Sequence, residues 1–241
     1  MYPNWINASL FNKTILNEKF LKVGFSQAGE DEVIRDFFWK DILLNKKRTY
    51  LDIGCFHDTL YSNTKLLNLA GWRGIAIDAN PDAQERWTQN RTQDTFLNLG
   101  IKSSGGFQQQ KTLNFFRFNS GEINTFEKKA AKAWIDKGFE LRDIIDVECK
   151  DLQEIAKIIL SIHPNFSPAF LNIDIEQVDY LDDLPRFLAL MSNPDLVCIE
   201  WIYKGFDINN FKESKEFQIL NSCNYKTICI LGGNLFAAHN Y

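Results

Sequence analysis

Short apolar runs rich in β-branched and aromatic residues alternate along the chain with longer segments of mixed polarity. The runs predict strands at residues 49–53, 74–77, 95–99, 169–173 and 196–199. The segments between them predict helices at residues 62–69, 81–89, 152–162 and 178–190. Strands that alternate with helices indicate an α/β fold, in which helices cover both faces of a mostly parallel sheet.

Less regular patterns flank this alternation. An apolar stripe of Val33, Ile34, Phe37 and Phe38 predicts an early helix, for which Ser26 is a plausible N-cap. Residues 1–25 show no clear period, so we expect an N-terminal extension followed by a single domain over residues 26–241. Added strands are expected at residues 111–118 and 146–149, and a helical insertion or cover at 121–142. A hairpin is expected at 226–238.

Length, charge and cysteine usage narrow the class of protein. The 241 residues suit one α/β domain, and a net charge of -4 without a basic stripe argues against a nucleic-acid partner. No apolar run reaches the roughly 18 residues of a membrane span, and the first residues lack the pattern of a signal peptide. Five cysteines occur without a CxxC pair. We therefore expect a cytoplasmic protein with reduced thiols.

Acidic residues stand at the ends of the first two predicted strands. In a doubly wound sheet, ligands bind at the carboxyl ends of the strands. Asp52 ends the first strand and precedes Gly54, and Asp78 ends the second strand. An acid at the position of Asp78 can accept hydrogen bonds from a ribose diol. In the alternative interpretation, Asp52 caps a turn and Asp78 only precedes the helix that begins near Pro81.

The turn after the first strand indicates which kind of nucleoside-containing ligand the pocket could bind. It contains Gly54 but lacks the GxGxxG pattern that brings a pyrophosphate close to the backbone. S-adenosylmethionine fits such a turn, since it has a ribose diol, an ammonium and a carboxylate but no phosphate. Asp52 could favour its cationic end. A nicotinamide-dependent oxidoreductase acting on a sugar nucleotide is an alternative, and the missing glycines argue against it.

Several sequence blocks together resemble one known family. They are SQAGED at 26–31, LDIG at 51–54, SNT at 62–64, GWRGIAIDANP at 71–81, FLNIDIE at 170–176 and Ile199-Glu200. In this order they resemble the FkbM family of S-adenosylmethionine-dependent methyltransferases. The resemblance implies a class I methyltransferase (Rossmann-like) fold, with a seven-stranded, mostly parallel sheet and a C-terminal antiparallel hairpin. It also implies O-methyl transfer to a hydroxyl of a sugar, glycan or related natural product.

The resemblance also implies contacts with the cofactor. Gln27 and Glu30 would line its pocket together with Asn63, although the first two residues could equally serve only a helix cap. Asn98, at the end of the third strand, could face the adenine. The chain departs from the family at Cys55-Phe56, where Ala-Asn is common, and at Gln177, where a glycine is common. The second departure concerns the acceptor side and leaves a catalytically silent binding module as an alternative.

Candidate groups for the chemistry follow the fourth and fifth strands. Methyl transfer to an alcohol requires removal of a proton, by a base or with the help of a metal ion. Asp174, Glu176 and Glu200 are candidates for the base, and Asp174 with Glu200 could hold a divalent cation such as Mg²⁺. Equally, the first two could cap a helix while Glu200 pairs with a lysine. His57 could be the base instead, because imidazole titrates near neutral pH.

Overall fold

A seven-stranded sheet forms the centre of the protein. The computed structural model describes residues 24–105, 111–175, 179–201 and 208–240. The strand order is β3-β2-β1-β7-β8-β10-β9, and neighbouring strands are parallel except that β10 runs antiparallel to both β8 and β9. This arrangement confirms the predicted class I methyltransferase fold with its C-terminal hairpin. The strands are β1 (Thr49–Ile53), β2 (Arg73–Asp78), β3 (Thr95–Asn98), β7 (Phe170–Ile173), β8 (Leu196–Glu200), β9 (Tyr225–Leu231) and β10 (Asn234–His239).

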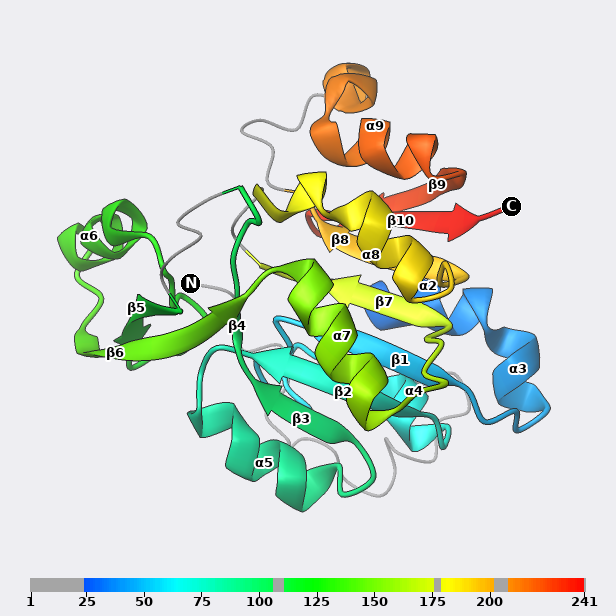
Figure 1. Ribbon diagram of the computed structural model, residues 1–241, viewed down its shortest axis with the longest axis horizontal. Coiled ribbons are helices and arrows are strands. Elements are labelled where there is room, and N and C mark those ends of the chain that lie inside the picture. Colours follow the sequence, from blue (N-terminus) through cyan, green and yellow to red (C-terminus); the bar gives the residue numbers. More distant parts are fainter. Residues whose placement is uncertain (1–23, 106–110, 176–178, 202–207, 241) are drawn as a thin grey trace, which may run out of the picture.

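Helices cover both faces of this sheet, as the alternating pattern predicts (Figure 1). One face carries α2 (Glu30–Phe37), α4 (Lys65–Leu69) and α5 (Asp82–Asn90), and α3 (Trp39–Leu43) follows α2. The other face carries α7 (Leu152–Ile162), α8 (Leu184–Leu190) and α9 (Lys215–Ser222). Alternate strand residues point to opposite faces, so that Leu51 and Ile53 pack with α7 and α8 while Tyr50 packs with α2 and α4.

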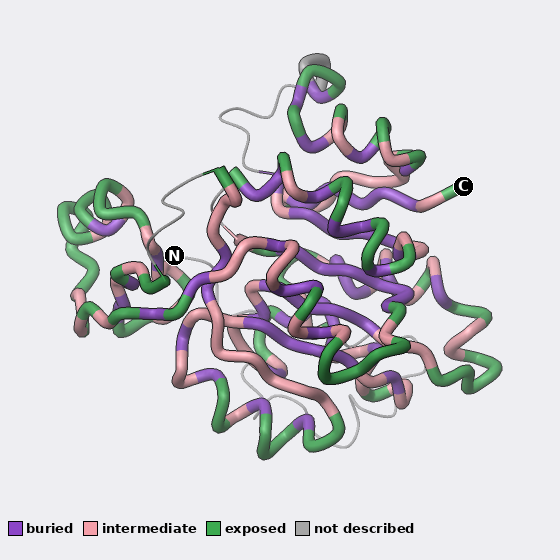
Figure 2. The backbone as a smooth tube through the Cα atoms, viewed as in Figure 1, coloured by how far each residue is buried: buried purple, intermediate pink, exposed green. Residues whose placement is uncertain are grey.

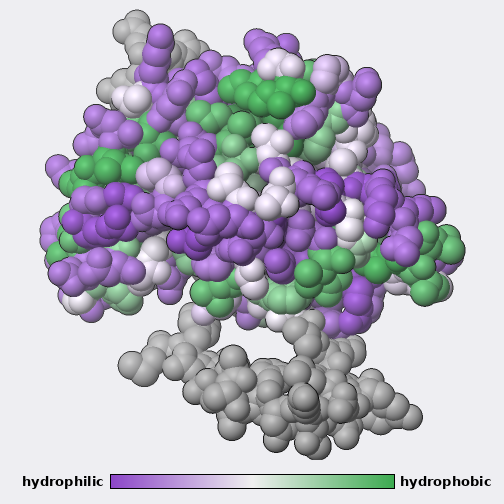
Figure 3. Space-filling view, turned by 90° about the horizontal axis from the view of Figure 1, so that it is seen from below, coloured by the Kyte–Doolittle hydropathy of each residue, from purple (hydrophilic) through white to green (hydrophobic). Residues whose placement is uncertain are grey.

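The core therefore lies in two layers, one on each side of the sheet. The inner strands β1, β2, β7, β8 and β10 are buried along most of their length, and the edge strands β3 and β9 are mostly half-buried (Figure 2). The outer helices show one buried and one exposed side. Seen from below, hydrophilic residues cover most of the surface, and hydrophobic residues form small separate groups (Figure 3). Among the described helices, none is long and apolar enough to cross a membrane.

A second, smaller sheet extends from the main one. It consists of β4 (Gly100–Ile101), β6 (Leu141–Lys150) and β5 (Thr112–Phe118), in that order, and α6 (Lys128–Asp136) connects β5 to β6. We call residues 111–150 the arm. The arm confirms the two added strands and the helical insertion, although β6 is longer than predicted. Ion pairs from Arg117 (3.0 Å) and Arg142 (2.5 Å) to Asp82 attach the arm to the first turn of α5.

Three helix predictions need correction at their ends. Helix α2 begins at Glu30, so Gly29 and not Ser26 occupies the N-cap position. The Ser26 hydroxyl still accepts hydrogen bonds from Gly29 N and from Asp31 N, which lies in the first turn of the helix. Helix α4 begins only at Lys65. The helix predicted at residues 178–190 is a 3-10 helix, η2 (Asp179–Asp182), followed by α8. Pro185 accounts for this break, because it has no N–H for a continuous helix.

Candidate functional site

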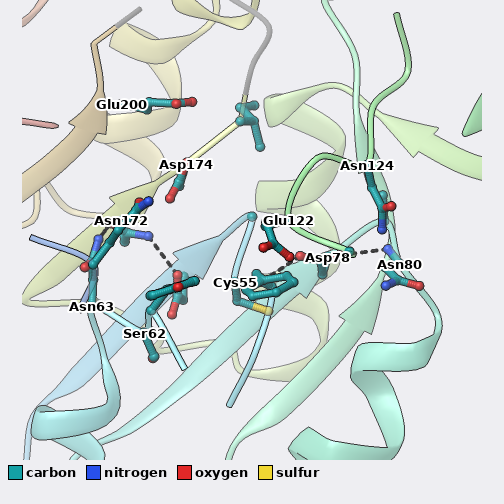
Figure 4. Close-up of a pocket in the computed structure, with 18 of the residues that line it drawn as sticks. Cys55, Ser62, Asn63, Asp78, Asn80, Glu122, Asn124, Asn172, Asp174 and Glu200 are labelled. Carbon is teal, nitrogen blue, oxygen red and sulfur yellow. Dashed lines mark hydrogen bonds between the residues drawn. The ribbon is translucent and has the colours of Figure 1, made fainter. Parts of the chain in front are cut away.

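A pocket of about 400 Å³ opens at the carboxyl edge of the main sheet. It lies where β1 sits between β2 and β7, which is the point where the strand order reverses and where ligands bind in such sheets. The ends of these strands and of β8 supply one wall, and residues 121–126 of the arm supply another (Figure 4). Its volume falls within the range of small-molecule sites, which is about 300–1,000 Å³.

Asp78 lies at the end of β2 and lines the pocket, as predicted. Its Oδ2 accepts a 2.7 Å hydrogen bond from the backbone N–H of Phe56, and its Oδ1 accepts one of 2.7 Å from that of Asn80. Burial raises the pKa of Asp78 to about 6, although these two bonds act in the opposite direction. Each carboxylate oxygen has a second lone pair. Asp78 can therefore still accept hydrogen bonds from two ligand hydroxyls.

Gly54 follows β1 at a position that only glycine can occupy. Its φ is +78°, and a Cβ at this position would lie 1.8 Å from the carbonyl oxygen of Asp174. The N–H of Gly54 bonds to the carbonyl of Ile77, and the N–H of Asp174 bonds to that of Ile53. The ends of β1, β2 and β7 are thereby drawn close together, and the pocket floor is made largely of backbone.

Asp52 lies at the pocket floor but is only 2% exposed. Its two oxygens accept hydrogen bonds from Thr64 Oγ1 (2.5 Å) and Asn172 Nδ2 (2.9 Å), and Asn63 Nδ2 donates to Asn172 Oδ1 at 3.0 Å. Burial raises the pKa of Asp52. The carboxylate thus orients Asn172, and through it Asn63, in the pocket wall. Both amides are buried, and both line the pocket.

Arg91 binds residues next to this network and holds them in place. No pattern in the sequence predicted this structural role. It follows α5 and is 2% exposed. Its guanidinium donates hydrogen bonds to Thr64 Oγ1 (2.8 Å), Ser62 Oγ (2.6 Å) and the carbonyl of Asp58 (2.8 Å). Because Ser62 and Thr64 are bound in this way, the segment before α4 is held against β1.

A second group of carboxylates lies at the other side of the pocket. Asp174 and Glu200, which follow β7 and end β8, lie near one another there (Figure 4). Asp174 lines the pocket and its side chain is exposed there. Burial and, next, the negative charge of Glu200 raise the pKa of Asp174 well above its ordinary value. Glu30, from α2, lines the same pocket and accepts hydrogen bonds from Ala28 N (2.7 Å) and Asn234 Nδ2 (3.0 Å).

Two predicted residues lie elsewhere. His57 does not line the pocket; its Nδ1 accepts hydrogen bonds from the N–H groups of Thr59 (3.0 Å) and Leu60 (3.2 Å), and burial lowers its pKa. Asn98 does not line the pocket either, because its Nδ2 donates to the carbonyls of Asp78 and Ala79. Both side chains hold loops beside the pocket, so the geometry supports neither the base nor the adenine contact.

Gln27 and Glu176 are the two other residues that were predicted from the resemblance or from their place after a strand. Gln27 lines the pocket, as the resemblance implied, whereas Glu176 lies outside the described residues. No group of three or more His, Cys, Asp or Glu side chains within the described residues is arranged to hold a metal ion, so the predicted Mg²⁺ site at Asp174 and Glu200 finds no support.

Several polar groups in the pocket wall were not predicted from the sequence. They are Asn80, Glu122, Asn124, Asn172 and Asn234. Asn80 and Asn172 stand inside the quoted blocks ANP and FLNI, so their position next to the strand-end acids was a usable signal. Glu122 and Asn124 reach the pocket only because the arm folds over it, which no local pattern indicates.

Comparisons with known proteins bear on the fold alone. Neither a protein family model nor a curated protein sequence matches the chain, and no comparison identifies the FkbM family. Among solved structures, a TehB-like SAM-dependent methyltransferase from Corynebacterium glutamicum is 11% identical with a TM-score of 0.41, and the match covers 88% of this chain and 85% of that one. The fibrillarin pre-rRNA processing protein of Methanococcus jannaschii is 12% identical with a TM-score of 0.46, over 95% and 85% of the two chains. Similarity this remote carries no argument about activity.

Proposed function

We propose that the protein is an S-adenosylmethionine-dependent methyltransferase. The observation that carries the proposal is Asp78 at the end of β2, facing a pocket whose neighbouring turn contains Gly54 but no glycine-rich phosphate loop. A carboxylate in this place suits a ribose diol, and the close approach of backbone at Gly54 leaves room for a nucleoside. A ligand with a nucleoside and no phosphate satisfies both conditions.

The charge of the pocket agrees with this ligand. Its described lining contains several carboxylates and no lysine, arginine or histidine. Such a lining favours the sulfonium and the ammonium of S-adenosylmethionine and disfavours a pyrophosphate, because like charges repel in a poorly hydrated site. The same argument weighs against a nicotinamide dinucleotide and against nucleic acid as the acceptor.

When bound, S-adenosylmethionine supplies an electrophilic methyl group on its sulfonium. The protein's part is to hold an acceptor hydroxyl in line with this group and to exclude water from the pocket. As the acceptor oxygen attacks the methyl carbon and the bond to sulfur breaks, the hydroxyl proton must leave. Asp174 is the proposed proton acceptor, because it is exposed to the pocket beside the floor formed by Gly54.

The proposed acceptor is a hydroxyl of a sugar, a glycan or a related natural product. This assignment rests on the resemblance of the sequence blocks to the FkbM family. Residues 121–126 of the arm line one side of the pocket, and the pocket of about 400 Å³ stays connected to solvent, so an acceptor can enter it. A catalytically silent binding module would share the fold and the cofactor site but transfer no methyl group.

The test is calorimetric titration of the purified protein with S-adenosylmethionine and, separately, with NAD. We expect S-adenosylmethionine to bind with micromolar affinity and NAD not to bind. Binding of NAD alone would refute the proposal. Incubation with candidate sugars and detection of S-adenosylhomocysteine then separates an enzyme from a silent module.

A further inference from the structure

Asn124 of the arm presents to the pocket an amide whose orientation is set by the protein. Its Oδ1 accepts a 2.7 Å hydrogen bond from the backbone N–H of Phe118, and the side chain lines the pocket. Because an N–H donor bonds to the oxygen of an amide, this bond decides which way the amide group faces. Among the described residues, the Nδ2 group has no hydrogen-bond partner. Asn124 therefore keeps its N–H donors for a ligand.

Asn80, after β2, is arranged in the same way. Its Oδ1 accepts hydrogen bonds from Asp82 N (3.2 Å) and Arg117 Nη1 (3.5 Å), and its Nδ2 is without a partner in the part of the chain that the structure describes. Its backbone N–H holds Oδ1 of Asp78 at 2.7 Å. Figure 4 shows Asn80, Asn124 and Asp78 on the same side of the pocket. A carboxylate that accepts hydrogen bonds and two amides that donate them therefore lie together.

Arg117 joins the arm to this side of the pocket. The side chain is buried, and its guanidinium binds both oxygens of Asp143 (2.7 and 2.5 Å) and Oδ1 of Asp82 (3.0 Å). Asp143 belongs to β6 of the arm, whereas Asp82 begins α5. Charge-assisted bonds of this bidentate kind fix geometry as well as adding energy. Since the next residue along the chain supplies the N–H that holds Asn124, the guanidinium sets where Asn124 lies relative to α5.

We propose that Asn124 is a binding residue for the nucleoside of the cofactor, and that Arg117 is the positioning residue that holds it beside Asp78. A nucleoside whose ribose diol is bound by Asp78 carries its ring oxygen and the ring nitrogens of its base a few bonds away. These atoms accept hydrogen bonds, and the Nδ2 group of Asn124 is the complementary donor. The inference deepens the proposed function and rests on it.

The experiment is a double-mutant cycle on the calorimetric affinity for S-adenosylhomocysteine. Asn124→Asp keeps an oxygen for the N–H of Phe118 but removes the donors. We expect Asn124→Asp and Arg117→Met each to weaken binding about fivefold or more, because each loses the hydrogen bond to the ligand. The double variant should bind no more than about twofold more weakly than the weaker single variant, since Arg117 acts through Asn124. Asn114→Asp, at an exposed position of β5, adds the same charge elsewhere on the arm and should bind normally.

Hydrogen exchange separates positioning from a general loss of stability. In Arg117→Met without ligand, the amides of residues 119–126 should exchange faster, while those of β1 and β7 exchange as in the unaltered protein. Lys132→Met breaks an exposed ion pair within α6 and is the control without an effect. Arg117→Lys keeps the charge but not the planar fork, and it takes the place of Arg117→Met in both measurements if that variant does not fold.

Three results would each overturn the inference while leaving the cofactor site in place. They are unchanged affinity of Asn124→Asp, additive losses of binding free energy in the double variant, and unchanged exchange of residues 119–126 in the Arg117 variant. If the unaltered protein binds no S-adenosylhomocysteine, the proposed function itself fails, and the inference fails with it.

Discussion

The backbone N–H of Phe56 donates a 2.7 Å hydrogen bond to Oδ2 of Asp78, and this bond joins the turn after β1 to the end of β2. Phe56 has a positive φ of 47°. The bond fixes one carboxylate oxygen in the pocket wall, and the N–H of Asn80 fixes the other. Asp78 therefore presents its carboxylate in a set orientation before any ligand arrives, which reduces the entropy lost on binding.

Replacing Asp78 tests the proposed ribose contact directly. We expect Asp78→Ala to weaken binding of S-adenosylmethionine by more than tenfold, because two charge-assisted hydrogen bonds to the ribose are lost. Calorimetric affinity measures the effect, and Asp146→Ala, at an exposed position of β6, is the control with unchanged affinity. Equal affinity of the Asp78→Ala and unaltered proteins would remove the ribose assignment.

The raised pKa of Asp78 predicts how stability depends on pH. The folded protein retains the proton up to about pH 6, whereas an unperturbed aspartate releases it near 3.8. The folded state therefore binds more protons between these values. The contribution of Asp78 to the free energy of unfolding is complete below pH 3.8 and is lost as pH rises through 6. The shift of about two units corresponds to roughly 3 kcal/mol.

Urea unfolding at a series of pH values measures this contribution. Burial also raises the pKa of Asp52, Asp94 and Asp174, and these groups act in the same direction. The informative quantity is therefore the difference between the unaltered protein and Asp78→Asn. We expect this difference to change between pH 4 and 6.5 and to stay constant above it. A difference independent of pH over this range would contradict the assignment.

Gly54 is expected to tolerate no side chain. In Gly54→Ala the Cβ would lie 1.8 Å from the carbonyl oxygen of Asp174, at a φ of +78°. Gly138 has a φ of +89° and nothing within 4 Å of its Cβ position, so Gly138→Ala isolates the cost of the backbone conformation. That cost is about 1–2 kcal/mol. Urea unfolding should show Gly54→Ala destabilised by clearly more than Gly138→Ala; equal losses would show that the strand ends separate easily.

The strands and the acids at their ends could be predicted because each depends on local sequence. The run Thr49–Ile53 is apolar and short, so β1 was predicted with its observed bounds, and Asp52 and Asp78 followed from the rule that parallel strands present their carboxyl ends to ligands. Residue types near a strand end were therefore enough to predict that Asp52, Gly54 and Asp78 line the pocket.

Contacts between distant segments could not be predicted in the same way. Asn63 donates a hydrogen bond to Asn172, which is 109 residues away in the sequence. Arg91, at the end of α5, donates one to Ser62 in the segment before α4. Both depend on how helices pack against the sheet, which local periodicity does not encode. The orientation of the His57 ring, which accepts hydrogen bonds from the N–H groups of its own loop, was likewise not indicated by the sequence.

Arg91 yields the last prediction, because it holds the Asp52 network without touching the pocket. Arg91→Met keeps a long apolar stem but leaves Ser62, Thr64 and the Asp58 carbonyl without their shared donor. Removing one partner from a buried charged network costs about 3–5 kcal/mol. Urea unfolding should show a loss of this size, and Arg35→Met, which breaks only surface ion pairs of α2, should lose less than about 1 kcal/mol. Losses of equal size in the two variants would show that the buried guanidinium does not support the pocket floor.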